Sequence, residues 1–347
     1  MSASAQKIPT SRLNVYVRFS GPDTGIPVLF IHGNASSSVF WKEIMEMLPP
    51  GFRGIAPDLR GYGDTDDVLI DATRGLGDFT DDLLALLDAL HIDTFHLIGH
   101  SLGGSIALHL TAAAGERVKS VTLVNPGSPF GFGGTKTVDG QPCWPDFAGS
   151  GGGIVNPAFA RLIAEKYRGT EDPQASPRVV MNSFYWKPPF VPHWEEELLD
   201  GLLSEKIGPD KYPGDMVASP NYPFAAPGVL GPVNAMSPKY VHDSVERLVQ
   251  STVKPSVLWI RGSDDQIVSD NSLFCLGTLG KFGFIPNYPG EDVYPPQPMV
   301  SQTRHVLDRY TQSGGQYREV VMNDTGHSPF IEKPEQFMEY FSAHLSA

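Results

Sequence analysis

Cysteine and long apolar runs are both scarce in this sequence. Only two of its 347 residues are cysteines, Cys143 and Cys275. Two are too few for the disulfide framework of a small secreted domain, so we expect two reduced, packed thiols. No segment approaches the ~18 consecutive apolar residues of a membrane-spanning helix, and residues 1–10 lack the apolar stretch of a signal peptide. These absences predict a cytoplasmic protein with no membrane partner.

Positive charge is also in short supply. The chain has 26 Lys and Arg against 39 Asp and Glu, which gives a net charge of −13. A nucleic-acid-binding protein needs a basic face to neutralise phosphates, so this balance argues against such a partner. No spacing of His, Cys or carboxylates resembles a metal site, and no glycine-rich phosphate-binding loop occurs. We therefore expect neither a metal nor a cofactor, and the sequence leaves the oligomeric state open.

Material for a core is ample, since 41% of the residues are hydrophobic. Over the first 127 residues, short apolar runs alternate with helical patterns, a rhythm that is typical of βαβ units and a parallel sheet. Strands covered on both faces give such nearly continuous apolar runs. The runs predict strands at 13–19, 26–31, 52–56, 94–98 and 118–124, with helices at 38–48, at 80–90 and from about 102 to 114.

The strand–helix rhythm stops near residue 127 and resumes late in the chain. Residues 128–250 are rich in Gly, Pro and aromatic residues, and strand patterns return only at 256–260 and 317–322. We therefore predict an α/β core made of residues 1–127 and 251–347, with a cap, or lid, inserted at 128–250. Helical patterns inside this insertion cover 157–167 and 194–203.

The pentapeptide 99–103, Gly-His-Ser-Leu-Gly, matches the motif G-x-S-x-G. It follows an apolar strand pattern and precedes a helical one, which is the context that gives this short motif its meaning. A nucleophile in such a place sits on a tight, strained turn, and glycines two residues before and after it avoid clashes. The start of the following helix also favours developing negative charge. The motif predicts Ser101 as a nucleophile.

A serine hydroxyl needs a base, and the base needs an acid to orient it. After such a turn the chain order is serine, acid, histidine. Of the six histidines downstream of Ser101, only His327 directly follows a late strand, in a loop where the sites of open α/β sheets gather. The other five fall in expected helices or in the insertion. We therefore predict His327 as the base.

The acid has three candidates on the loop after the 256–260 strand. Asp264 and Asp265 are adjacent, so one of them can orient His327 while the other caps the turn. Asp270 is the third candidate. The residue pattern alone leaves this choice open.

A reaction of this type also needs two N–H donors that face the developing oxyanion. One is expected from Leu102, the residue after the nucleophile, and the other from Asn34, in the loop after the 26–31 strand. The sequence leaves open whether the Asn34 side chain faces the substrate as well.

These motifs, in this order, resemble the α/β-hydrolase superfamily, in particular its cap-bearing soluble serine hydrolases of esterase or lactonase type. The resemblance covers residues 12–127 and 251–345 and implies an α/β-hydrolase fold, with a mostly parallel sheet, helices on both faces and a large cap. In that family the acid usually stands two residues before an Ile-Val-type pair, which implies Asp265. The matching segments are His32-Gly33-Asn34, Asp58-Leu59-Arg60-Gly61-Tyr62-Gly63, Gly99-His100-Ser101-Leu102-Gly103-Gly104, Gly262-Ser263-Asp264-Asp265-Gln266-Ile267-Val268 and Gly326-His327-Ser328-Pro329.

Two features depart from the family pattern: the insertion at 128–250 is large for a cap, and the interval between the acid and the histidine is long. The segment His32-Gly33-Asn34 resembles haloalkane dehalogenases and epoxide hydrolases, but those enzymes use an aspartate nucleophile, so Ser101 implies neither activity. The interval from Asp265 to His327 is long and holds a second insertion, 273–299. This insertion either lines the pocket mouth or supports the cap.

The resemblance and the aromatic content of the cap together predict hydrolysis of an ester or lactone of a bulky apolar or aromatic small molecule, through an acyl-enzyme. We expect Trp186, Phe184 and Trp144 to face the pocket. Three alternatives stay open: amide or C–C bond hydrolysis by the same triad, acyl transfer to an alcohol or amine, and a ligand receptor of this fold that signals through cap movement.

Overall fold

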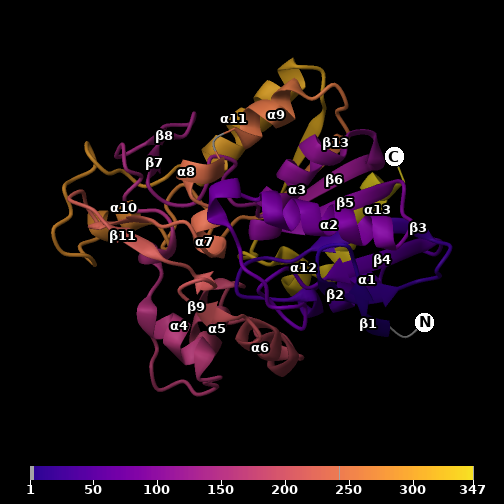
Figure 1. The fold of residues 1–347 in the computed structure, drawn as a ribbon, viewed down its shortest axis with the longest axis horizontal. Helices are drawn as coiled ribbons and strands as arrows, with labels where there is room; N and C mark the ends of the chain where they lie inside the picture. The colour runs from indigo at the N-terminus through magenta and orange to yellow at the C-terminus, as the bar shows by residue number, and fades with distance from the viewer. Residues whose placement is uncertain (1–3, 242, 347) are drawn as a thin grey trace.

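The computed structural model describes residues 4–241 and 243–346. Its centre is an eight-stranded sheet with the order β1-β2-β4-β3-β5-β6-β13-β14 (Figure 1). β2 pairs antiparallel with β1 and β4, and every other neighbouring pair is parallel, which confirms the predicted mostly parallel sheet. The strands are β1 (Ser4–Pro9), β2 (Asn14–Ser20), β3 (Ile26–Ile31), β4 (Phe52–Pro57), β5 (Phe95–His100), β6 (Val118–Val124), β13 (Ser256–Gly262) and β14 (Tyr317–Met322).

β1 is the strand of this sheet that the sequence pattern did not predict. It pairs with β2 at the edge of the sheet, from Ser4 opposite Phe19 to Pro9 opposite Asn14. All of its residues are exposed except Ile8, which is half-buried. A strand with no buried face has no alternation of apolar and polar residues, so periodicity cannot reveal it.

Helices cover both faces of the sheet, as predicted. Side chains alternate along β3, so Leu29 and Ile31 belong to one apolar cluster and Val28 and Phe30 to the other. The predicted helix at 38–48 is a short 3₁₀ turn, η1 (Ser38–Trp41), followed by α1. The first face packs against α2 (Gly77–Ala89), α3 (Leu102–Ala114), α9 (Ser244–Gln250) and α11 (Met299–Gln312), and the second against α1 (Lys42–Glu46), α12 (Pro329–Glu332) and α13 (Pro334–Leu345).

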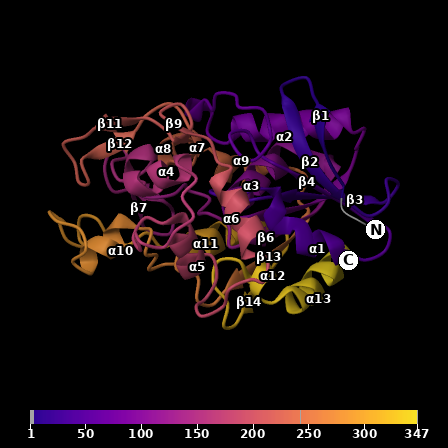
Figure 2. The same ribbon diagram turned by 90° about the horizontal axis from the view of Figure 1, so that it is seen from below.

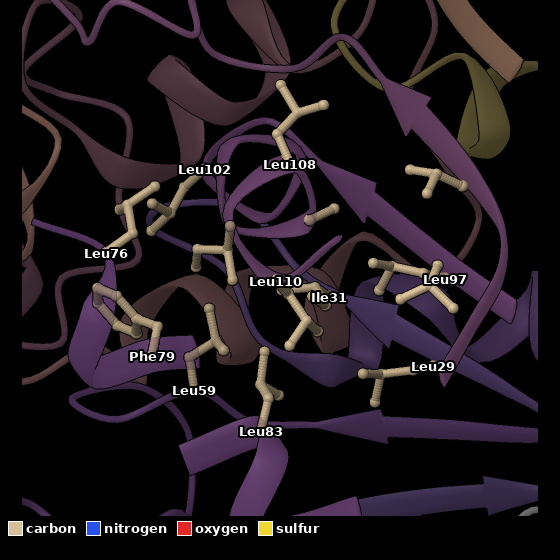
Figure 3. Packing of buried hydrophobic residues seen from close by; sticks show 14 of the residues in the cluster. Leu29, Ile31, Leu59, Leu76, Phe79, Leu83, Leu97, Leu102, Leu108 and Leu110 are labelled. Atoms are coloured by element: carbon tan, nitrogen blue, oxygen red, sulfur yellow. The ribbon is translucent and has the colours of Figure 1, made fainter. Parts of the chain in front are cut away.

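The first cluster fixes the strands whose ends carry the candidate site. Figure 3 shows Leu29 and Ile31 of β3 and Leu97 of β5 in the same cluster as Phe79 and Leu83 of α2. All five side chains are buried. Burying a side chain of this size stabilises a fold by about 1.5–3 kcal/mol. The carboxyl ends of β3 and β5 are therefore held rigidly side by side, and the loops that follow them start from fixed positions.

Residues 128–250 contribute no strand to the central sheet in the parts of the chain that the structure describes. Their short strands form three separate two-stranded pairs, and in both views most of the segment lies at the end of the sheet away from the chain termini (Figures 1 and 2). The domain boundaries at 127 and 250 stay a prediction. Besides α9, the segment contains β7 (Thr135–Lys136), β8 (Gln141–Pro142), η4 (Gly152–Ile154), α4 (Pro157–Ala164), α5 (Pro177–Phe184), α6 (Glu195–Leu203), β9 (Ile207–Gly208), β10 (Tyr212–Pro213), β11 (Met216–Ala218), β12 (Ala225–Pro227), α7 (Pro232–Ala235) and α8 (Pro238–Val241).

The second insertion lies at the same end of the molecule and contains α10 (Leu276–Lys281) (Figures 1 and 2). The ring of Tyr222 packs edge-on against Tyr288 and Tyr294, with ring centroids 5.9 and 5.2 Å apart. The two inserted segments therefore support each other. Two further 3₁₀ turns, η2 (Ala72–Arg74) and η3 (Gly115–Arg117), connect core elements. None of the helices in the described parts of the chain has both the length and the hydropathy needed to cross a membrane.

Candidate active site

Ser101 occupies a strained turn between β5 and α3. Its backbone has φ 56° and ψ −119°, a region that a residue with a side chain enters only at a cost of about 1–3 kcal/mol. A Cβ at Gly99 would lie 2.1 Å from the carbonyl oxygen of Gly103, and a Cβ at Gly103 would lie 2.3 Å from that of Ile31. The turn therefore needs both glycines of the motif. It leaves Ser101 partly exposed.

His327 and Asp265 meet between the loops that follow β14 and β13. Nδ1 of His327 lies 2.8 Å from Oδ2 of Asp265, and both side chains are buried. Oδ1 of Asp265 accepts the backbone N–H groups of Ile267 and Val268 at 2.8 and 3.0 Å. A carboxylate only accepts hydrogen bonds, so Nδ1 carries the proton and Nε2 is left as the basic nitrogen.

The other two acidic candidates lie elsewhere. Asp264 is 37% exposed, accepts a hydrogen bond from Ser263 and pairs with Lys187 at 3.0 Å. These two contacts, the one from Ser263 first, lower the pKa of Asp264. Asp270 accepts both the backbone N–H and the hydroxyl of Ser301. Of the three acidic candidates, the structure thus brings only Asp265 to His327.

The two expected oxyanion donors lie beside Ser101. Leu102 is the first residue of α3, where a backbone N–H has no partner inside its own helix. Within residues 4–241 and 243–346, no protein acceptor takes the backbone N–H of Leu102 or of Asn34. The Asn34 side chain is turned toward Tyr62, whose hydroxyl donates to Oδ1 at 2.7 Å. The backbone N–H groups of Leu102 and Asn34 therefore remain available to a substrate oxygen.

Two histidines next to these loops form hydrogen bonds with backbone groups. His100 Nε2 donates to the carbonyl oxygen of His327 at 2.8 Å, and burial lowers the pKa of His100 well below its ordinary value. His32 Nε2 accepts the backbone N–H of Leu59 at 3.0 Å, and its pKa is also lowered by burial. Both rings are thus neutral and hold turns.

Asn125 and Glu332 also hold the His327 loop, and sequence reasoning missed both. Asn125 Nδ2 donates to the carbonyl oxygens of Gly326 and His327 at 3.1 and 2.6 Å. Glu332 accepts the backbone N–H of Gly326 at 2.6 Å and that of Lys187 at 3.0 Å. Burial raises the pKa of Glu332 to about 7. Because these contacts are made to backbone atoms, no spacing of residues in the sequence predicts them.

A cavity of about 360 Å³ opens at Ser101 and His327. Of the three expected aromatic residues, Phe184 lines it. Trp186 is instead 1% exposed and packs among core side chains beside Tyr185 and Phe190, and Trp144 is not among the lining residues. The walls are mostly apolar and come from both inserted segments as well as the core: Ala35, Phe132, Ile154, Val155, Phe159, Val180, Phe184, Tyr185, Tyr212, Val233, Met236, Ile267, Leu273, Phe274, Leu276 and Leu279.

A second, smaller cavity of about 40 Å³ meets the first at Ser101, Phe132 and Met236. Apolar side chains of α3 and α9, including Leu108 and Leu248, form much of its wall. Ser101 therefore stands where a large and a small apolar cavity join. Within the described parts of the chain, no group of three or more His, Cys, Asp or Glu side chains is placed to hold a metal ion.

Comparison with known proteins bears on the family and the fold of the chain. Residues 26–287 match the sequence model of a family described as alpha/beta hydrolase fold. Epoxide hydrolase 2 of Siraitia grosvenorii is 37% identical over 119 residues, which are 34% of this chain and 36% of that protein. A 2-hydroxy-6-oxo-6-phenylhexa-2,4-dienoate hydrolase of Burkholderia cepacia is 32% identical over 118 residues, 33% of this chain and 41% of that protein. The chain thus matches about two fifths of these relatives' lengths.

Solved structures resemble the chain over nearly its whole length. The crystal structure of the esterase RhEst1 from Rhodococcus sp. ECU1013 superposes on 100% of this chain and 99% of its own, with a TM-score of 0.58 and 19% sequence identity. At this identity the likeness is one of fold. It extends over both inserted segments as well as the sheet.

Proposed function

Because the chain belongs to the α/β-hydrolase fold family, we propose that it is a serine hydrolase that cleaves an ester or lactone bond of a bulky apolar or aromatic small molecule. The observation that carries this proposal is the site itself. Ser101 and His327 line one cavity, and Asp265 lies 2.8 Å from the far nitrogen of His327. Both observations support Ser101 as the nucleophile, His327 as its base and Asp265 as the orienting acid of an acyl transfer.

In the first half of the reaction, Ser101 Oγ attacks the substrate carbonyl carbon while His327 Nε2 takes the hydroxyl proton. Asp265 keeps the ring in the required tautomer and stabilises the imidazolium that forms. The backbone N–H groups of Leu102 and Asn34 bind the oxyanion. The carbon–oxygen bond to the leaving group then breaks, and His327 protonates the departing alcohol.

In the second half, water attacks the acyl group bound to Ser101. His327 removes a proton from the water, the oxyanion forms again at the same two N–H groups, and the acid leaves as His327 returns the proton to Ser101. The buried side chains of His327 and Asp265 strengthen the electrostatic part of this step, since a shielded pair interacts more strongly than one in water.

The two cavities favour a substrate with unequal apolar parts. The larger one holds a ring system against Phe159, Phe184 and Phe274, while the smaller one, beside Leu108 and Leu248, holds a short group. Predominantly apolar walls with few polar groups are the usual lining of a small-molecule site. A C–C bond hydrolase is the second candidate, favoured by the partial match to the Burkholderia cepacia dienoate hydrolase.

A steady-state assay on p-nitrophenyl esters of increasing acyl length, with aromatic esters and lactones, tests the proposal. Ser101→Ala serves as the matched control. We expect turnover by the natural chain and none above background in the variant. Turnover of diketones but not of esters would favour C–C cleavage.

Labelling by a serine-directed phosphonate separates the remaining outcomes. Labelling of Ser101 without ester turnover means a working nucleophile with a narrow substrate range. The absence of both turnover and labelling would contradict the catalytic proposal and favour a receptor.

A further inference from the structure

Glu205 is a buried carboxyl group that the reaction does not use. It lies just after α6, and its side chain is 1% exposed. Neither carboxyl oxygen has a hydrogen-bond partner of good geometry among the described residues. Burial raises the pKa of Glu205 well above its ordinary value, although the Tyr62 hydroxyl and the Ala35 backbone amide approach closely enough to oppose that rise. A buried group of this kind calls for an explanation, because leaving it unpaired costs free energy.

The neighbours of Glu205 hold the turn that carries Asn34. Ala35 has φ +45°, a left-handed backbone that a residue with a Cβ rarely adopts. The Tyr185 hydroxyl donates to the carbonyl oxygen of Ala35 at 2.9 Å, and the Tyr62 hydroxyl donates to Oδ1 of Asn34 at 2.7 Å. The strained turn is therefore held by two tyrosine hydroxyls.

Glu205 lies among three buried tyrosines, which together with it we call the Glu205 cluster: Glu205, Tyr62, Tyr185 and Tyr212. The pKa of each tyrosine is raised, by burial first and also by the proximity of Glu205. Tyr62 belongs to the loop after β4, whereas the other three members belong to residues 128–250. The cluster thus joins the inserted segment to the turn after β3.

The backbone around Glu205 is fixed to the same core loop. The Ser204 hydroxyl accepts the backbone N–H of Gly63 at 3.2 Å. On the other side, the backbone N–H of Lys206 donates to the carbonyl oxygen of Gly61 at 3.0 Å. With both neighbours anchored, Glu205 is held beside the core loop that carries Tyr62.

Building on the proposed function, we propose that Glu205 is a positioning residue for the oxyanion turn: its carboxyl group supports Tyr62 and the backbone of Ala35 from behind, which keeps the Asn34 N–H directed at the oxygen bound above Ser101. Glu205 touches neither the substrate nor the reacting atoms. In its neutral form it offers one donor and one acceptor, enough for a tyrosine hydroxyl and a backbone amide. A full negative charge there would oppose the charge that develops on the substrate oxygen.

Two substitutions separate this role from simple packing. Glu205→Gln keeps the shape, a donor and an acceptor without charge, whereas Glu205→Leu keeps only an apolar side chain of similar size. Glu197→Leu is the matched control, because Glu197 lies on α6, is half exposed and pairs with Lys42 at the surface. Each full-length variant is assayed on the p-nitrophenyl ester that the natural chain hydrolyses fastest, with active sites counted by phosphonate titration.

We expect Glu205→Gln and the control to keep kcat within about threefold, and Glu205→Leu to lose about tenfold to a hundredfold in kcat with KM nearly unchanged. Binding of a trifluoromethyl ketone, whose adduct on Ser101 places an oxyanion in the same hole, should weaken by the same factor in the leucine variant. If Glu205 only filled space, its replacement by leucine would lower the melting temperature but would not produce a loss in kcat at an unchanged KM.

Unchanged kcat and inhibitor binding in Glu205→Leu would overturn the inference, as would equal losses in the glutamine and leucine variants. If the leucine variant does not fold, Tyr62→Phe takes its place, since it removes the hydroxyl that reaches Asn34, and the same losses are expected. If the phosphonate labels the natural chain but no ester is turned over, the rate of labelling is compared between the variants in place of kcat. If it neither turns over esters nor labels, the proposed function fails, and the inference fails with it. A normal leucine variant of an active enzyme refutes the inference alone.

Discussion

At the scale of single residues, Asp264 and Asp265 show how one position along the chain changes a side chain's environment. Asp265 is buried against His327, and its second oxygen accepts two backbone N–H groups. Asp264 points to the surface and to Lys187. Adjacent residues on a turn point in different directions, so one carboxylate contacts the candidate base His327 and the other contacts a surface lysine.

Asp265→Asn should lower kcat by about 10³–10⁴-fold and leave KM nearly unchanged, because an amide can hold the ring in the wrong tautomer. Asp264→Asn is the matched control and should stay within about twofold, since exposed ion pairs contribute little. Steady-state kinetics on one ester decides the matter. Equal effects of the two substitutions would contradict the assignment of Asp265.

The backbone of Ser101 permits a second test at this scale. Glycine adopts a positive φ freely, whereas alanine retains the Cβ that makes the turn strained. Ser101→Gly should therefore be more stable than Ser101→Ala by about 1 kcal/mol in the free energy of unfolding, with both variants inactive. Urea denaturation measures the difference. Equal stability of the two variants would mean that the turn stores no strain.

At the scale of elements, α12 links the His327 loop to the inserted segment. Glu332 of this helix accepts the backbone N–H groups of Gly326 and Lys187, one from each side. Its pKa is about 7, against an ordinary value of 4.5, mainly because burial penalises the charge. Ionisation at this position therefore works against folding even while it favours the two hydrogen bonds.

A raised carboxyl pKa has a defined effect on stability. Between about pH 4.5 and 7 the folded chain binds more protons here than the unfolded chain, so the stabilising contribution is complete below that window and is lost as the pH rises through 7. Relative to Glu332→Gln, the natural chain should lose roughly 3 kcal/mol of unfolding free energy from about pH 4 to pH 8. Urea titrations of both chains across this range measure it, and parallel pH profiles would disprove it.

The accuracy of the sequence interpretation also differs between elements. β3 and β6 begin and end where predicted, because both of their faces are largely covered and the apolar run stops where burial stops. β14 also matches its prediction, although only Val320 and Met322 of this edge strand are buried. β1 is exposed and was missed, since its backbone pairing with β2 requires no particular side chains. Short motifs fixed by backbone sterics, such as the glycines around Ser101, are likewise readable from the sequence.

Pocket walls are the part that the sequence could not define. Trp186 and Phe184 are close neighbours with similar aromatic character, yet one is buried in the core and the other lines the cavity. Which of them faces inward depends on how two long inserted segments pack together, for which no periodicity exists. For the same reason, the sequence pattern did not indicate a structural role for Glu205 or Tyr212.

At the scale of the whole molecule, substitutions of Phe184 and Trp186 should separate the effect of a cavity wall from that of a core residue. Phe184→Ala should lower kcat/KM for aromatic esters by at least about tenfold with little change in stability. Trp186→Ala should cost about 3–5 kcal/mol of unfolding free energy, because it empties a packed site. Kinetics and urea denaturation of both variants test this, and a reversal of the two effects would show that the wall is assigned to the wrong ring.

The candidate reacting groups stand on core loops, whereas the Phe and Tyr side chains of the cavity wall come from the two inserted segments. Ser101, His327 and Asp265 stand on loops at the ends of sheet strands, whereas Phe159, Phe184 and Phe274 stand on the two inserted segments. Mutations at these three wall positions can therefore change the cavity without altering the side chains of the proposed triad. In evolutionary terms, the inserted segments can change the shape of the cavity from one descendant to the next, while the sheet keeps the three loops of the proposed triad in place.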